Sequence, residues 1–124
     1  MKTMLQEKKR YYQRIAEQNR QKIFPYSHKV LQSFYSRLRF KLIMELALQH
    51  DNGLIVDLGC SDAYFLLSIP KKGCSKIGID LLTNALKNAK LGASILDLKT
   101  QSEFLAGDAE QICLKDNCVD LIIC

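Results

Sequence analysis

Three aspartates each come at the end of a short apolar run that has the composition of a buried strand. Asp57 lies in "LIVDL", Asp80 ends "KIGID", and Asp108 follows "FLAG". In an open parallel sheet, the carboxyl ends of the strands meet at one edge, where ligands bind. A carboxylate there can accept hydrogen bonds from hydroxyl and amino groups. We therefore predict a nucleoside site in which Asp80 accepts from both ribose hydroxyls and Asp108 from an adenine amino group, while the amide of Ala109 donates to the ring.

The turn "GCSDA", residues 59–63, decides which nucleotide fits this site. Gly59 allows a close approach of the backbone to a ligand and a positive φ. A dinucleotide site would need the pattern GxGxxG to hold a pyrophosphate, but Ser61 and Tyr64 occupy the second and third glycine positions. Asp57 would also repel a phosphate and favour a cationic group. A dinucleotide oxidoreductase remains an alternative that tight binding of NAD would support.

The elements that must position these residues alternate between strand and helix. Strands are predicted at residues 53–58, 76–80, 103–108 and 118–124, and helices at 62–69 and 83–91. This order is typical of an α/β fold with a Rossmann-like, doubly wound parallel sheet. Before the first strand, apolar residues recur at intervals of three and four and predict a helix over 27–50. Its apolar face comprises Leu31, Phe34, Tyr35, Leu38, Leu42, Ile43 and Leu46.

The charge of the chain is unevenly distributed. Residues 1–45 contain eleven Lys and Arg against three Glu, whereas residues 46–124 contain seven Lys against ten acids. We therefore divide the chain into a basic helical arm or lid at 1–50 and a nucleotide-binding domain at 51–124. The arm could contact nucleic acid or an anionic membrane. A solvated helix that covers the site is the interpretation we favour over nucleic-acid binding.

The five cysteines form an odd set without a CxxC pair, which argues against a disulfide framework and predicts a reduced, cytoplasmic chain. Cys113 and Cys118 have no second Cys/His pair to complete a zinc site, so no metal is predicted. No apolar run approaches the roughly 20 residues that a transmembrane helix needs. We therefore expect no transmembrane segment.

Three stretches together, "LIVDLGCSDAYFL", "KIGIDLLTNALKNAK" and "FLAGDAEQICLKDNCVDLIIC", resemble the first four motifs of the class I S-adenosylmethionine-dependent methyltransferases. The resemblance covers residues 53–124. It implies S-adenosylmethionine as the cofactor, whose amino acid and sulfonium would suit the acidic turn. The cofactor-binding residues that it implies are Asp57, Gly59, Cys60, Ser61, Asp80, Leu81, Asp108 and Ala109. Residues 57–61 would face the methionine part, and Leu81 would lie against the adenine.

The resemblance also implies methyl transfer to an acceptor whose class the residues do not identify, and no catalytic residue is assigned. Because the family's sheet continues beyond its fourth strand, we expect a fold truncated after the fourth strand and a chain that is part of a longer protein. The alternative is a non-catalytic module that binds the cofactor, RNA or a protein. The family commonly has glycine where Ser61 and Ala63 stand, and a left-handed Ser61 would cost about 1 kcal/mol. Ala63 is the milder of the two departures.

Overall fold

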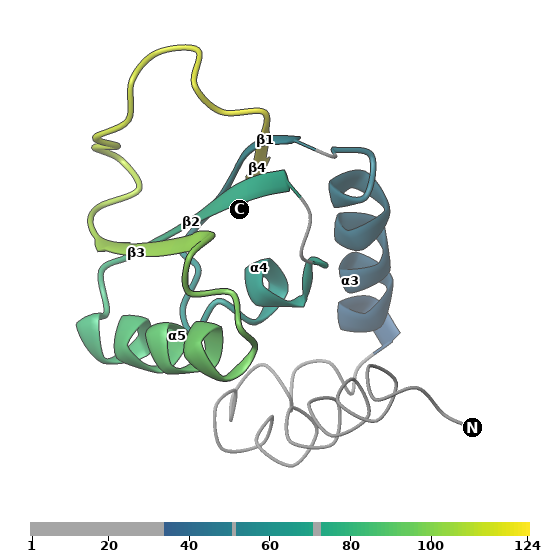
Figure 1. Ribbon diagram of the computed structural model, residues 1–124, viewed down its shortest axis with the longest axis horizontal. Helices are drawn as coiled ribbons and strands as arrows, with labels where there is room; N and C mark the ends of the chain where they lie inside the picture. Colours follow the sequence, from purple (N-terminus) through teal and green to yellow (C-terminus); the bar gives the residue numbers. More distant parts are fainter. Residues whose placement is uncertain (1–33, 51, 71–72) are drawn as a thin grey trace.

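The computed structural model describes residues 34–50, 52–70 and 73–124. Figure 1 shows how the elements are arranged. Their bounds are α3 Phe34–Ala47, β1 Asn52–Leu58, α4 Tyr64–Ser68, β2 Gly73–Asp80, α5 Thr83–Ile95, β3 Ser102–Ala106 and β4 Leu121–Ile123. The greater part of the predicted arm, residues 1–33, lies outside the described residues. The division at residue 50 and the nucleic-acid contact therefore stay predictions.

The four strands form one sheet in the order β3-β2-β1-β4, and every neighbouring pair is parallel. Val56 of β1 is paired with Ile77 on one side and with Ile122 on the other. The chain therefore proceeds outward from β1 to β2 and β3, and then crosses back to place β4 on the other side of β1. This reversal confirms the predicted Rossmann-like, doubly wound fold, and it marks the place where such sheets bind ligands.

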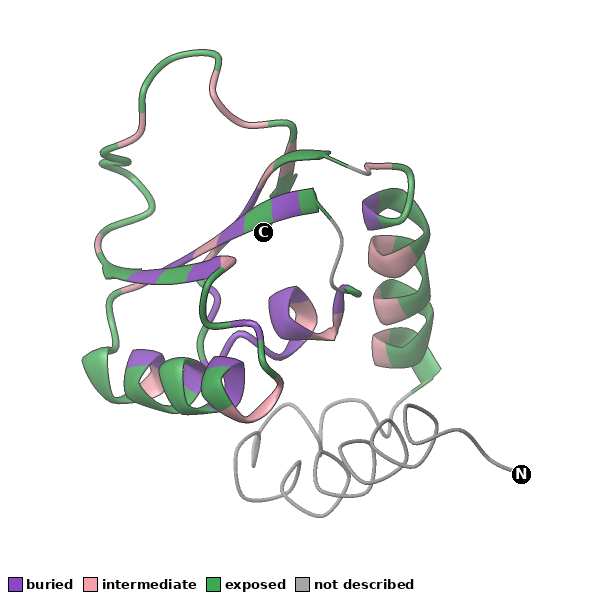
Figure 2. Cartoon of the chain, in the orientation of Figure 1, coloured by how far each residue is buried: buried purple, intermediate pink, exposed green. Residues whose placement is uncertain are grey.

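The core lies between the sheet and the helices. Ile55 of β1 and Leu66 of α4 are fully buried, as is Ala89 of α5. Figure 2 shows the buried residues on the sides of α4 and α5 that face the sheet. The long connection 107–120 lies on the opposite side of the sheet from α4 and α5 (Figure 1). The described helices therefore pack on one face of the sheet and leave its carboxyl edge open to a ligand.

The apolar face predicted for the first helix is not the face that α3 buries. Five of its described residues are exposed, namely Phe34, Tyr35, Leu38, Leu42 and Leu46. The residues that pack on the core are instead Phe40, Ile43, Met44 and Ala47, which also recur at intervals of three and four. Among the described residues, the predicted apolar face and the face that packs on the core therefore share only Ile43. Four of the exposed residues, all except Phe34, line a pocket with β4, the edge strand of the described sheet.

A buried lysine joins α4 to the sheet. Lys76 of β2 is 1% exposed, and its Nζ donates a hydrogen bond to the main-chain oxygen of Ile69 at 2.8 Å. Ile69 is the residue that ends α4, and a cation there is favourable because the last carbonyls of a helix carry partial negative charge. Burial lowers the pKa of Lys76 to about 8. The lysine thus fixes the C-terminus of α4, and with it the helix that follows the turn at 59–63.

The last strand begins later than the sequence predicts, at Leu121 instead of Cys118. Asp120 explains the difference, since its Oδ2 accepts a hydrogen bond from the amide of Leu54 at 2.8 Å. Its own amide donates to the oxygen of Leu54 at 2.9 Å. Asp120 therefore joins β4 to the start of β1 through its side chain, and regular strand pairing follows it.

Within the ranges that the structure describes, no helix has the length and apolarity to span a bilayer.

Candidate functional site

An open pocket of about 330 Å³ lies at the carboxyl edge of the sheet. Its lining residues are Gly59, Ile79, Asp80, Leu81, Leu82, Gly107, Asp108 and Ala109. Five of the eight residues predicted to bind a cofactor are among them, although they come from three separate segments of the chain. The volume is at the lower end of the range of about 300–1,000 Å³ that is usual for small-molecule sites.

The turn after β1 is held against β2 by its backbone. The amides of Gly59 and Cys60 both donate to the oxygen of Ile79, at 2.8 and 3.1 Å. Gly59 has a φ of +71°, and a Cβ at this position would meet no atom within 4 Å. The glycine therefore provides both the left-handed backbone and an open space on the pocket side. A ligand can lie against this backbone without meeting a side chain.

Asp80 organises the turn as well as lining the pocket. Its Oδ2 accepts a hydrogen bond from the amide of Ser61 at 2.7 Å, and its Oδ1 accepts from the amide of Leu82 at 2.8 Å. A carboxylate has about four lone-pair positions, so each oxygen can accept one further hydrogen bond from a ligand hydroxyl. The sequence predicted the ligand role alone. The link between Asp80 and Ser61 depends on the pairing of β1 with β2, which local sequence does not reveal.

The two departures from the glycine pattern are both in the left-handed region, with φ values of +52° at Ser61 and +59° at Ala63. The left-handed backbone expected at Ser61 is thus confirmed. Ala63 has the same conformation, so it is no milder in backbone strain than Ser61. Its methyl group is fully buried in the core, however, and burial of apolar area compensates part of the strain.

This geometry predicts the stability of variants at Ser61. Ser61→Gly should be more stable than Ser61→Ala by about 1 kcal/mol, because glycine has no Cβ to clash in the left-handed region. Asn88, an exposed residue in the middle of α5, is the matched control. There the glycine variant should be less stable than the alanine variant by about 1 kcal/mol. Urea unfolding of the four variants measures both differences, and the same order at both sites would contradict the assigned backbone strain.

Asp57 is a buried acid at the end of β1. Burial raises the pKa of its carboxyl from 3.8 to about 7; the charge of Arg39 opposes this shift and that of Asp80 adds to it. A cationic group in the site would favour the ionised carboxylate. Asp57 does not line the open pocket itself. Its contact with the methionine part of a cofactor stays a prediction. Arg39, which sequence analysis missed, is the residue whose positive charge lowers the pKa of Asp57 in the folded chain.

Cys60 is buried, and its side chain belongs to the core. A Cβ added at Gly78 of β2 would lie 2.8 Å from the Cys60 sulfur, which shows how tightly the turn packs on the sheet. Burial, followed by the charges of Asp57 and Asp80, raises the pKa of the Cys60 thiol to about 12. The thiol is therefore protonated near neutral pH and is no nucleophile. A contact of Cys60 with the cofactor, if made through its backbone, stays a prediction.

The residues after β2 and β3 form the far end of the pocket. Leu81 is 68% exposed there, as a side chain that stacks on a ligand would be. The Oδ1 of Asp108 accepts a hydrogen bond from the amide of Glu110 at 2.9 Å, so this acid also closes a turn. Ala109 is exposed beside it. The roles predicted for these three residues toward adenine are compatible with this placement and remain predictions.

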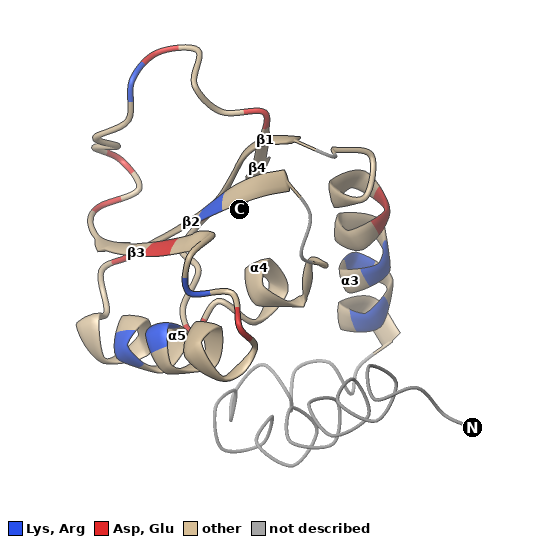
Figure 3. Cartoon of the chain, in the orientation of Figure 1, with Lys and Arg blue, Asp and Glu red and all other residues tan. Residues whose placement is uncertain are grey.

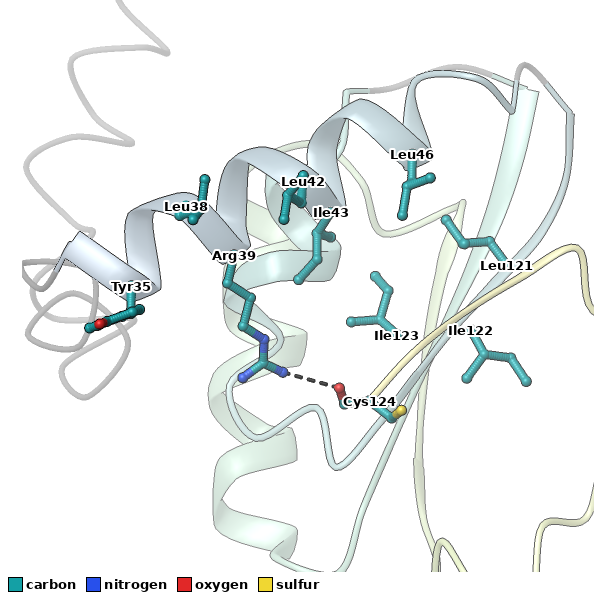
Figure 4. A pocket seen from close by; sticks show the side chains of 10 residues that line it. All are labelled: Tyr35, Leu38, Arg39, Leu42, Ile43, Leu46, Leu121, Ile122, Ile123 and Cys124. Atoms are coloured by element: carbon teal, nitrogen blue, oxygen red, sulfur yellow. Dashed lines mark hydrogen bonds between the residues drawn. The ribbon is translucent and has the colours of Figure 1, made fainter.

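A second and larger pocket, of about 380 Å³, lies between α3 and β4 (Figure 4). Its lining is apolar except for Arg39, and it includes Leu38, Leu42 and Ile122. It shares no lining residue with the pocket at Asp80.

In the part of the chain that the structure describes, no group of three or more His, Cys, Asp or Glu could hold a metal ion.

Comparison with protein families yields one match, to the family described as "Methyltransferase domain", over residues 56–124. A comparison with curated proteins found no match. The family match begins in β1 and includes every residue that lines the pocket at Asp80.

Solved structures resemble the chain in fold. A SAM-dependent methyltransferase from Thiobacillus denitrificans, in complex with S-adenosyl-L-homocysteine, is 27% identical with a TM-score of 0.54, over 68% of this chain and 34% of that one. An RNA methyltransferase from Salinibacter ruber is 20% identical with a TM-score of 0.58, over 67% of this chain and 54% of that one. The cyclase SpnF is 19% identical with a TM-score of 0.64, over 70% and 32%. The chain thus spans about a third to a half of the length of these proteins.

Proposed function

This chain belongs to the methyltransferase domain family, and from that premise we propose that it binds S-adenosylmethionine and takes part in methyl transfer to an acceptor of unidentified class. The methyltransferase from Thiobacillus denitrificans supports the proposal, because it is 27% identical and its structure contains S-adenosyl-L-homocysteine. The fold by itself would not suffice, since the cyclase SpnF shares it.

The observation that carries the proposal is the convergence of Gly59, Asp80, Leu81, Asp108 and Ala109 on one pocket. A nucleoside needs an acceptor for its ribose hydroxyls, an apolar surface for its base and open space along the backbone. Asp80, Leu81 and Gly59 provide these three features in that order. The residues present therefore fit the cofactor.

Within this site each residue has a separate task. Asp80 accepts the ribose hydroxyls while its bond to the amide of Ser61 holds the turn. Asp108 and Ala109 contact the adenine edge, and Asp57 provides negative charge near the methionine part. When bound, S-adenosylmethionine supplies an activated methyl group. The chain's contribution to the reaction is to fix the orientation of that group, which is the main source of rate in a displacement of this kind.

The acceptor, the partners and the compartment of the whole protein are part of the proposal and not of the findings. We propose a reducing compartment such as the cytoplasm, which is supported by the five free cysteines of the described residues. The solved structure from Salinibacter ruber is that of an RNA methyltransferase, so RNA is one acceptor class to test.

Calorimetric titration with S-adenosylhomocysteine, and separately with NAD, tests the proposed cofactor. We expect saturable binding of S-adenosylhomocysteine and none of NAD, because Ser61 and Tyr64 stand where a pyrophosphate site has glycine. Circular dichroism must first show that the protein is folded. Tight binding of NAD alone would overturn the proposal in favour of a dinucleotide enzyme.

A further inference from the structure

β3 forms the edge of the described sheet that lies opposite β4. Among the described residues, β2 is its only strand neighbour. The amide of Lys76 of β2 donates a hydrogen bond to the oxygen of Gln101 at 2.7 Å, just before β3 begins. Main-chain groups of successive residues in a strand point to opposite edges, so those of Ser102 and Phe104 point away from β2. This edge of β3 therefore offers amides and carbonyl oxygens to a further strand.

A groove of about 360 Å³ lies along the same edge, between β3 and α5. Residues 102–105, four of the five residues of β3, line it together with Lys90 of α5 and with Lys99. We call it the β3 groove. It shares no lining residue with the pocket at Asp80. A ligand in the β3 groove would therefore lie along the strand and outside the proposed cofactor site.

The charges of the β3 groove favour an acidic ligand on the side of α5. Lys90 and Lys99 are both exposed, and neither forms an ion pair with any described residue. α5 has basic residues and no acid (Figure 3). Glu103 is the acid of the lining, but side chains alternate between the two faces of a strand. Glu103 is exposed, whereas its neighbours Ser102 and Phe104 are buried toward the helices.

The β3 groove also has apolar and unsatisfied polar surface. Leu105 is 41% exposed, and it follows Glu103 on the face of β3 that points away from α5. The hydroxyl of Ser102 is buried, yet no described residue forms a hydrogen bond with it, which is unusual for a buried polar group. An extended peptide that alternates acidic and apolar side chains matches this surface. Its acids would lie beside the lysines and its apolar side chains beside Leu105.

We propose that the edge of β3 binds an acidic, extended peptide segment of a partner protein as an added strand, with Lys90 and Lys99 contacting its acidic side chains. Main-chain hydrogen bonds provide the affinity in this mode of recognition, and side chains provide the specificity. A second copy of the chain fits less well, because it would bring the same lysines to the edge and like charges repel. A nucleic acid has no peptide main chain to pair with β3, and Glu103 would repel its phosphates.

The probe is a capped, fluorescent peptide of alternating valine and glutamate, about seven residues long, which is enough to span β3. A control peptide has lysine in place of each glutamate. Both are titrated by fluorescence anisotropy into the wild-type chain and two double variants. Lys90→Gln with Lys99→Gln removes the charges of the β3 groove. Lys87→Gln with Lys115→Gln removes two exposed charges outside it. Circular dichroism and thermal unfolding check that each protein is folded.

The wild-type chain should bind the acidic peptide saturably and the lysine peptide at least about tenfold more weakly, because opposite charges attract at the two lysines. The double variant at Lys90 and Lys99 should bind the acidic peptide about fivefold more weakly than the wild-type chain, since exposed ion pairs are each worth little. The double variant at Lys87 and Lys115 should change this affinity by less than about twofold.

Hydrogen exchange followed by NMR tests whether the peptide pairs with the strand. The bound peptide should slow the exchange of the amides of Ser102 and Phe104 by about tenfold or more, because these amides gain a main-chain acceptor. The amides of Glu103 and Leu105 already face β2, so their exchange should stay as it is in the free protein.

Two outcomes would overturn the inference directly. One is the absence of saturable binding of the acidic peptide by the folded wild-type chain up to about 1 mM. The other is binding that leaves the exchange of Ser102 and Phe104 unchanged, which would mean that the peptide is held by charge without strand pairing. Equal weakening by both double variants would also contradict it, since net charge alone would then explain the binding. None of these outcomes bears on the proposed cofactor, because the inference does not depend on it.

Discussion

Asp80→Asn is expected to weaken the binding of S-adenosylhomocysteine by about 100-fold or more, because hydrogen bonds from ligand hydroxyls to a carboxylate are each worth about 1.5–3 kcal/mol. The variant keeps the size of the side chain but replaces one acceptor oxygen with an NH2 donor. It therefore cannot accept from the amides of Ser61 and Leu82 and from both ribose hydroxyls at once. Calorimetric titration of the variant and the wild-type chain measures the loss.

The control for this prediction is Asp116→Asn, which removes the same charge from an exposed turn in the connection 107–120. It should bind S-adenosylhomocysteine with unchanged affinity. Thermal unfolding of Asp80→Asn separates the two roles of the residue. A folded variant that binds like the wild-type chain would exclude Asp80 from the ribose site. A variant without a cooperative transition would show that the turn at Ser61 cannot form without the carboxylate.

Asp57→Asn is expected to stabilise the unliganded protein at pH 8 by roughly 4 kcal/mol and to have little effect at pH 4. Burial raises the pKa of this carboxyl from 3.8 to about 7 in the folded state. Between these values the folded chain holds a proton that the unfolded chain has lost. Stability contributed by the neutral carboxyl is complete below about pH 4 and is lost as the pH rises through about 7. Asparagine remains neutral throughout and avoids this loss.

Urea unfolding of the wild-type chain and Asp57→Asn at several pH values tests the sign and the size of this effect. Their difference in free energy of unfolding should grow by about 1.4 kcal/mol for each pH unit between 4 and 7 and then level off. Asp116→Asn, whose carboxyl is exposed, should show no comparable change. A constant difference between the wild-type chain and Asp57→Asn would mean that Asp57 is ionised in the folded state over the whole range. In that case Asp57 would already be compensated by Arg39 before any ligand binds.

Three residues near the site make the protein less stable while no ligand is bound. Asp57 is buried at the end of a strand, and Ser61 and Ala63 hold a left-handed backbone. A buried acid is unfavourable in a hydrophobic core, and a left-handed backbone is unfavourable for residues other than glycine, so such features are typical of functional sites. A ligand with a cationic group compensates the first of them directly. The protein should therefore gain stability on binding the cofactor, and the gain should rise with the logarithm of the ligand concentration above the dissociation constant.

The order of the elements could be predicted because each is specified locally. Continuous apolar runs around Val56 and Ile79 mark buried strands, and Gly59 marks the turn that follows the first of them. The parallel, doubly wound character of the sheet was accessible for the same reason, because parallel strands joined by short helices have few alternatives. The positions of Asp80 and Asp108 at strand ends followed from this order. The family resemblance added the cofactor, the contact of Leu81 with the adenine and the contact of residues 57–61 with the methionine part.

The sequence by itself determined the α/β order, the family and the residues at the carboxyl ends of the strands, since these depend on local pattern and spacing. Only the tertiary structure decided what those residues touch. The fold bonds Asp80 to the amide of Ser61, buries the thiol of Cys60 and turns most of the predicted apolar face of α3 away from the core. It also bonds Arg39 to the main-chain oxygen of Cys124. The physical reason is that each of these facts joins elements far apart in the chain. Hydrophobic periodicity shows that a helix has an apolar face, but the neighbours that the fold places around that face decide which of its residues are buried.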